Sequence, residues 1–214
     1  MGFPNIDKYL VKRFIENFSE IQFDDGFAIN DTFDDMDSGQ IAEIAMYLNR
    51  KTFTPDLRSR GGNQVFVFPH FPQLDMPLPQ IGISLGQETA SDHFLGDAAG
   101  NSTRYPLTGT QTHWDVPKIY IGAATYRIDV VTATKDEAIW LARMIQRFLC
   151  ELQEELSNIG VYEMDIVLAD LKLEQDQQPQ TIFNRAVQIN CKIQNSWTKR
   201  IPMETYQTGI NTAL

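Results

Sequence analysis

The sequence has few of the side chains from which reactive and metal-binding sites are built. Its 214 residues include two cysteines and three histidines. Cys150 lies in a helical pattern and Cys191 in a strand pattern, so we expect two buried small hydrophobic residues and no disulfide framework. None of the histidines, His70, His93 and His113, stands at metal-ligand spacing from another histidine or from a cysteine. The sequence therefore predicts no metal centre and no cofactor.

Catalytic motifs are missing as well. The sequence has no phosphate-binding loop, dinucleotide fingerprint, nucleophile elbow or kinase signature. Glu154 and Glu155 are adjacent on a predicted helix, so they face different directions and cannot act as a carboxylate pair. We therefore expect a protein that is not an enzyme. The alternative is a small-molecule enzyme whose site lies in the segment 86–117, with His93, His113 and Asp115 as its candidate residues.

Positive charge is scarce. The chain has 18 Lys and Arg against 28 Asp and Glu, which gives a formal net charge of −10. This balance argues against adhesion to nucleic acid or to an anionic membrane. The acidic segment 31–39 faintly resembles a calcium loop, but its Gly39 is at the wrong position and no glutamate closes the loop. We expect a solvated turn there.

Long apolar runs are absent too. No run approaches the ~20 residues needed to span a bilayer, and the N-terminus lacks a basic stretch followed by an apolar core, so we expect neither a membrane segment nor a secretory signal. With 43% hydrophobic residues, a chain of this length can bury one core without disulfides or metals. We expect a single domain at 1–200 with a peripheral C-terminal arm at 201–214.

Two long helices are predicted from apolar residues at helical spacing. The first follows Pro4-Asn5 and repeats every fourth residue through Ile6, Leu10, Phe14 and Phe18. The second covers 135–157 and begins with a capping-box sequence, Thr134-Lys135-Asp136-Glu137. Gly160 follows it as a left-handed stop. A shorter helix is expected at 41–48, with a strand at 45–48 as the alternative. The long helix carries one continuous apolar stripe: Ala138, Leu141, Ala142, Ile145, Phe148, Leu149, Leu152 and Leu156.

Alternating apolar residues predict the strands. A short hairpin is expected from Ile21 to Ile29 around Asp24-Asp25-Gly26. The last strand alternates strictly, so we expect it to be antiparallel with one solvated face and to end at Trp197. Further strands are expected at 65–68, 80–85, 119–131 and 164–173, the third with a change of face near Ala124. These patterns predict an α+β fold, in which a mainly antiparallel sheet is packed on one face by the N-terminal helix and the long capped helix.

The segment 86–117 has no clear periodicity. A structureless stretch of this length is unusual in a compact domain, so it is either a functional extension or a hairpin. Its aromatic residues include Phe94, Tyr105 and Trp114. Because few basic residues accompany them, we interpret them as packing residues or protein-contact anchors rather than stacking platforms for nucleic acid.

The order of elements and several short strings resemble the tail-terminator and related neck proteins of tailed bacteriophages. The strings are Pro79–Thr89 with Phe94–Asp97, then Ala124–Val131, the helix Asp136–Leu156 and Ile166–Ala169, before a last strand ending at Trp197. The resemblance covers roughly residues 1–200. The acidic segment 31–39 and the long segment 86–117 depart from the family pattern.

The resemblance implies a structural virion protein. Members of that family form rings, usually hexameric, that cap the tail tube and join it to the head-side connector, and their sheet lines or rims a channel for DNA. It therefore implies self-association, contacts with neck connector and tail tube proteins, passage of DNA without specific binding, and a place in the virion neck or tail after assembly in the host cytoplasm. An acidic chain is compatible with that role, because a negative lumen repels phosphate.

Candidate contact residues follow from the parts of the chain expected to protrude. They are Glu174, Gln178 and Pro179 in the turn 174–180, and Phe94, Tyr105 and Trp114 in the middle segment. The solvated face of the last strand is a further candidate. Besides the enzyme, two alternatives stay open: another tail-assembly or baseplate structural protein, and a monomeric cytoplasmic adaptor.

Overall fold

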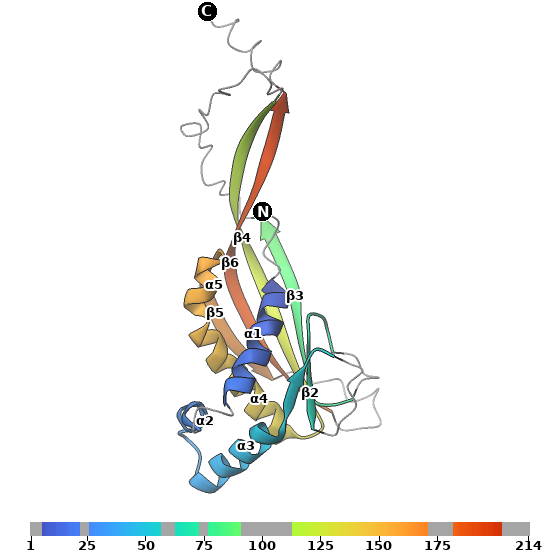
Figure 1. Cartoon of the computed structure of the whole chain (residues 1–214), viewed down its shortest axis with the longest axis vertical. Helices are drawn as coiled ribbons and strands as arrows, with labels where there is room; N and C mark the ends of the chain where they lie inside the picture. Colours follow the sequence, from blue (N-terminus) through green and yellow to red (C-terminus); the bar gives the residue numbers. More distant parts are fainter. Residues whose placement is uncertain are drawn as a thin grey trace, which may run out of the picture.

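The computed structural model describes residues 6–21, 26–56, 63–72, 77–90, 113–170 and 182–202, of which 90, 113–120, 169–170 and 195–202 are described by their backbone alone. Within these residues there are five helices and one six-stranded sheet, and the helices Ile6–Glu20, Lys135–Glu151 and Gln153–Asn158 lie against one face of the sheet (Figure 1). The predicted α+β class is confirmed.

The sheet has the strand order β1-β2-β3-β4-β6-β5. The pairs β1–β2 and β2–β3 are parallel, and the three remaining pairs are antiparallel, so the expectation of a mainly antiparallel sheet is confirmed. The strands are β1 (Thr52–Thr54), β2 (Gln64–Phe68), β3 (Gln80–Ala90), β4 (His113–Thr132), β5 (Val161–Asp170) and β6 (Phe183–Pro202).

Three of the helices cover the sheet, and α2 packs against α3 and α4. Both long apolar stripes are confirmed, since their predicted residues are buried in α1 and α4. The predicted helix 135–157 is interrupted at Leu152, which separates α4 from α5. Gly160, at φ 95°, ends the helical segment as expected. The helices are α1 (Ile6–Glu20), α2 (Phe27–Thr32), α3 (Ser38–Arg50), α4 (Lys135–Glu151) and α5 (Gln153–Asn158).

The two helix starts differ from expectation in their caps. Thr134 accepts a hydrogen bond from the Glu137 amide at 3.4 Å, which is one half of the predicted capping box. The full reciprocal box instead precedes α3, where Asp37 accepts from the Gln40 amide and Gln40 accepts from the Asp37 amide. Asp37 lies in the acidic segment, so that segment starts a helix and is more than a solvated turn.

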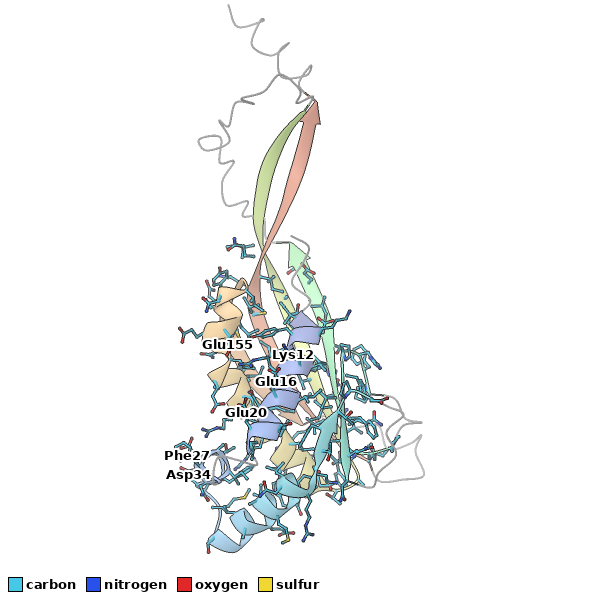
Figure 2. All side chains as sticks on the ribbon, viewed as in Figure 1. Lys12, Glu16, Glu20, Phe27, Asp34 and Glu155 are labelled. Atoms are coloured by element: carbon cyan, nitrogen blue, oxygen red, sulfur yellow. The ribbon has the colours of Figure 1, made fainter. Side chains whose placement is uncertain are left out.

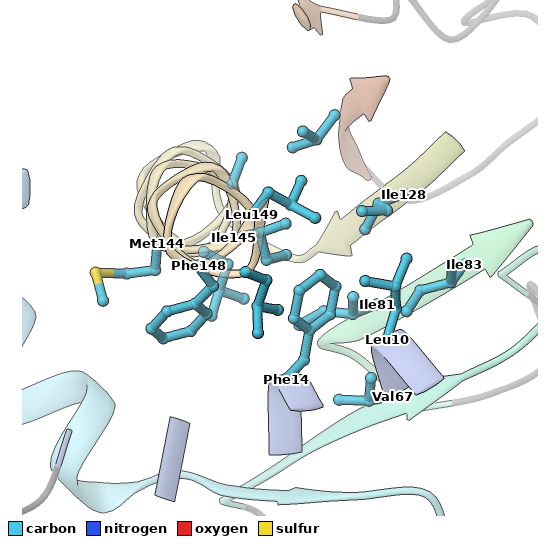
Figure 3. Packing of buried hydrophobic residues seen from close by; sticks show 14 of the residues in the cluster. Leu10, Phe14, Val67, Ile81, Ile83, Ile128, Met144, Ile145, Phe148 and Leu149 are labelled. Atoms are coloured by element: carbon cyan, nitrogen blue, oxygen red, sulfur yellow. The ribbon is translucent and has the colours of Figure 1, made fainter. Parts of the chain in front are cut away.

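The core lies between the helices and the sheet (Figure 3). Phe18 holds two layers together, because its ring stacks on Phe53 of β1 at 3.9 Å and meets Phe148 of α4 edge-on at 4.8 Å. Leu10 and Phe14 of α1 point at the same region. The close-up shows them meeting α4 and three central strands through Val67, Ile81, Ile83, Ile128, Ile145 and Leu149.

The predicted hairpin from Ile21 to Ile29 is wrong. Phe27–Thr32 forms the helix α2, and Gly26 precedes it in the left-handed conformation at φ 79°. Ala28 and Ile29 are both buried although they are adjacent, which an alternating strand would not allow. Gly26 therefore precedes a helix instead of closing a turn between strands.

Two strands are much longer than predicted. Strand β3 continues to Ala90 and β4 begins at His113, so both ends of the segment 86–117 are strand, while residues 91–112 lie outside the described residues. Strand β6 does not end at Trp197 but continues to Pro202, which places the first two residues of the predicted arm in the sheet. The hairpin interpretation of the middle segment fits the antiparallel pairing of β3 with β4.

The predicted change of face in β4 is also wrong. Ala124, Tyr126, Ile128 and Val130 are all buried and share one face, so the alternation continues without a break. The irregularity lies in the neighbouring strand, where a bulge between Leu85 and Gln87 of β3 shifts the register.

The reverse face of the sheet is covered by chain at one corner. A Cβ atom added to Gly82 would lie 2.5 Å from the His70 carbonyl oxygen and 2.7 Å from Pro72 Cδ. The segment after β2 therefore lies directly on this face. Phe66 and Phe68, which alternate with the core residues of β2, are buried there, and the Phe68 ring stacks on His70 at 4.5 Å.

The two cysteines have different environments. Cys191 is buried as expected, and burial raises the pKa of its thiol to about 11. Cys150 is exposed, so the expectation that both are buried is wrong for this residue. It falls beside the apolar stripe of α4 and outside it, one position after Leu149.

Candidate assembly surfaces

The most unusual feature of the molecule is a two-stranded ribbon that projects beyond the body (Figure 1). Pairing of β3 with β4 ends at Ala90–Gly122, and pairing of β5 with β6 ends at Val161–Ile193. Beyond these points β4 and β6 continue together through nine further pairs, from Ile121–Gln194 to His113–Pro202. At ~3.3 Å per residue this ribbon is roughly 30 Å long.

The ribbon lacks a core among the described residues. An isolated two-stranded hairpin is at best marginally stable in water, and three or more strands or a helix against one face are normally required. The helices α1, α4 and α5 lie against the body and not against the ribbon (Figure 1). The ribbon is therefore a segment that gains stability when something packs against it.

The two edges of the ribbon are not equivalent. The Gln194 amide donates to the Gly160 carbonyl at 2.8 Å, so the even-numbered residues of β6 direct their backbone polar groups toward the β5 side. Thr198 is one of them, and it pairs with Pro117. The Pro117 nitrogen consequently faces the outer edge of β4, where it has no hydrogen to donate.

Proline in this position blunts the outer edge of β4. The outer edge of β6 keeps its donors, since Ser196, Thr198 and Arg200 direct their amides and carbonyls away from β4. Among the described residues no strand pairs with this edge beyond Gln194. One edge of the ribbon is thus open for strand addition and the other is protected.

A second open edge belongs to β5, the last strand of the sheet. Asp165 pairs with Asn190, an even-numbered residue of β6, so the backbone N–H and C=O of Asp165 point toward β6. The alternate residues Ile166 and Leu168 therefore direct their backbone groups toward the outer edge of β5. The strand has apolar side chains on both faces, because Ile166 and Leu168 are half-buried under the helices while Val167 is 42% exposed on the reverse face. Long edges of this kind invite pairing.

Four acidic side chains are labelled on the helix side of the molecule, together with the basic Lys12 (Figure 2). Glu16, Glu20 and Glu155, with Asp34 beside the exposed Phe27, are labelled over α1, α5 and the α2 region. Only part of this charge is free of internal partners. Glu155 accepts hydrogen bonds from Tyr9 and Arg13, which lower the pKa of its carboxyl.

Ion pairs fix α2 and the following turn to α4. Arg143 makes a two-pronged contact with Asp35, at 2.7 and 3.0 Å, and this contact lowers the pKa of the carboxyl. Arg147 pairs with Asp31 and, at 2.8 Å, with Glu151. These carboxylates therefore have a structural role, and they are not free to bind a partner.

The reverse face over β4 and β6 is polar but close to neutral. Asn190 Oδ1 accepts hydrogen bonds from Thr125 at 3.1 Å and from Gln188 at 2.8 Å. Arg127 pairs with the buried Asp129 at 2.8 Å, and Lys192 pairs with Glu163. The predicted solvated face of β6 is confirmed, but its charges are balanced locally.

The predicted contact residues lie almost entirely outside the described residues. This holds for Glu174, Gln178 and Pro179 and for Phe94 and Tyr105. Trp114 lies in the ribbon, where its backbone pairs with Ile201. Among the enzyme candidates, His93 also lies outside, while the backbones of His113 and Asp115 belong to β4.

Sequence patterning missed the ribbon for a definable reason. Residues 113–118 include Pro117, which normally argues against a strand, and the pattern of β6 was read as ending at its tryptophan. In the part of the chain that the structure describes, no helix is long and apolar enough to cross a membrane, and no three His, Cys, Asp or Glu side chains gather as a metal site.

Comparison with known proteins gives no relative from which to transfer a function. No protein-family model matches the chain, and no curated protein matches it either.

Proposed function

We propose that this chain is a structural subunit of a tailed-phage virion, which forms a neck or tail-terminator ring that caps the tail tube and joins it to the head-side connector. The proposal combines the resemblance in element order with the projecting ribbon. It assigns no catalytic residue and requires no metal or cofactor. Its partners are further copies of the same chain, usually six in that family, and the adjacent connector and tube proteins, while DNA passes without specific binding.

The β4–β6 ribbon is the observation that carries the proposal. A two-stranded extension of nine residue pairs, against which no described helix or third strand packs, has little value to a protein that acts alone. In an assembly it supplies contact surface at a distance from the body. A rigid α+β body with a projecting ribbon is a shape that favours ring or tube contacts over substrate binding.

The charge distribution supports the same proposal. The chain has a net charge of −10, and acidic side chains gather on the helix side. A ring that DNA must traverse benefits from surfaces that do not bind phosphate. The reverse face of the sheet, whose charges are paired, would neither attract nor strongly repel DNA.

The size of the purified protein tests the proposal. Mass photometry at micromolar concentration and negative-stain microscopy should show a closed ring, with a mass that is an integral multiple of the 24.4 kDa subunit. Addition of tail tubes should place the ring at tube ends. A strictly monomeric protein that does not bind tube ends would overturn the proposal.

A further inference from the structure

We propose that subunits join head to tail by strand addition, with the outer edge of β6 at 196–201 pairing with the outer edge of β5 at 165–170 of a second copy. This inference deepens the proposed function and rests on it, because it supposes that the chain associates with itself. It names which two edges meet, and it makes the contact asymmetric.

The open edge of β6 requires an occupant. Ser196, Thr198 and Arg200 direct amides and carbonyls away from β4, and no described strand receives them. The opposite edge of the ribbon is interrupted by Pro117. Strand addition is therefore directed to the β6 side.

The outer edge of β5 has the length and exposure that the β6 edge needs. The regular part of β5 after its bulge, Asp165–Asp170, is as long as the free stretch of β6, about 20 Å in each case. The other sheet edge, β1, has only three residues. Strand β3 also extends past its pairing with β2, from Ile83 to Ala90, but it has one acidic residue there, Glu88, where β5 has three.

Charge favours the same match. The ribbon is basic in an acidic chain, because Lys118, Lys199 and Arg200 outnumber Asp115 and give it a net charge of +2. Strand β5 contains Glu163, Asp165 and Asp170 and no basic residue. Segments of opposite sign attract each other, whereas two ribbons or two β5 strands would repel.

The symmetry of the contact follows from its chemistry. Two different surfaces meet, so the contact is heterologous, and repetition gives a closed ring or an open filament according to the rotation between copies. An isologous pair of ribbons would instead stop at a dimer. The ribbon also gains a third strand, which is the minimum for a stable sheet.

Removal of a single backbone donor tests the pairing. Thr198→Pro removes one outward amide while every β4–β6 hydrogen bond stays, because residue 198 does not bond to β4. We expect the concentration for half-assembly to rise roughly tenfold or more. Thr198→Ala is the matched control, since it changes the same side chain and keeps the amide, and it should assemble as the wild type does.

Two variants test the β5 edge, so that the pairing can still be tested if one of them fails to fold. Ile166→Pro removes an outward amide of β5, and Asp165→Lys reverses a charge on an exposed side chain. Circular dichroism and thermal unfolding identify variants that fold as the wild type does. Each folded variant should be monomeric at concentrations where the wild type assembles.

Mixing gives the decisive outcome. Thr198→Pro retains an intact β5 edge, and the β5 variant retains an intact ribbon, so an equimolar mixture should form a heterodimer and nothing larger. A wild-type oligomer that Thr198→Pro leaves unchanged would overturn the strand addition but leave the ring subunit standing. A wild-type protein that never associates would overturn both. Larger assemblies in the mixture would contradict the single asymmetric joint.

Discussion

At the residue scale, a close approach between two backbone segments explains why residue 82 is a glycine. Gly82 is the third residue of β3, and a glycine inside a strand normally weakens it. Its place is explained by the segment after β2, whose His70 carbonyl and Pro72 ring occupy the space of a side chain. The glycine thus permits the parallel β2–β3 connection to cross the reverse face of the sheet.

We expect Gly82→Ala to lower the free energy of unfolding by about 1–3 kcal/mol, as overpacking does in other proteins. The added Cβ would meet backbone atoms, which cannot rotate away. Gly86→Ala on the same strand is the control, since its nearest neighbour lies at 3.3 Å and the loss should be smaller. Urea denaturation measures both. Equal stability of Gly82→Ala and the wild type would show that the segment does not lie on Gly82.

The Arg143–Asp35 contact predicts a pH effect at a single carboxyl. Hydrogen bonding to Arg143 lowers the pKa of Asp35 in the folded protein, so the contact stabilises the fold at neutral pH, and this stabilisation is lost as the pH falls through that lowered pKa. Carbon-13 NMR titration of the carboxyl should show the lowered value and its return to the ordinary range in Arg143→Gln. An unchanged titration in that variant would contradict the contact.

At the element scale, a helix or strand could be predicted when its pattern of buried residues is clear in the sequence, and was missed when it is not. The stripes of α1 and α4 were predicted because each helix buries one face, and β6 because it has one buried and one solvated face. The helix α2 was missed because six residues hold too few periods to distinguish it from a strand after Asp-Gly. The break at Leu152 has no sequence signal, since the apolar stripe continues through it to Leu156.

The cap of α4 gives an element-scale prediction. Thr134→Ala removes the hydroxyl that accepts from the Glu137 amide, so we expect a loss of about 1 kcal/mol in the free energy of unfolding. Thr134→Ser keeps the hydroxyl and should retain most of the stability. Equal losses in the two variants would show that the hydroxyl does not cap the helix.

At the scale of the whole molecule, the body and the ribbon have different requirements. The body buries its own core, and its ion pairs are closed within the chain. The ribbon has an edge that no described strand pairs with, and a net positive charge in a molecule of net charge −10. Little of the candidate assembly surface was predicted from sequence, because an open strand edge is defined by what does not pair with it, and pairing is a property of the tertiary fold.

Salt dependence is a prediction at this scale. If a basic ribbon meets an acidic β5 edge, screening of the charges should weaken association, and the concentration for half-assembly should rise between 50 and 500 mM salt, values that bracket a Debye length of about 10 Å. Analytical ultracentrifugation across that range measures the effect. Association that strengthens with salt would indicate an apolar contact instead.

Hydrogen exchange of the ribbon tests the central claim most directly. Amides of Ser196, Thr198 and Arg200 point away from β4, and no strand in the described part of the same chain protects them. Mass spectrometry of peptides covering 194–202, in monomer and in assembled fractions of the wild type, should show rapid exchange in the monomer and strong protection in the assembly, together with new protection in 165–170. Exchange that is equally rapid in both fractions would contradict the claim that the ribbon is completed by a neighbouring subunit.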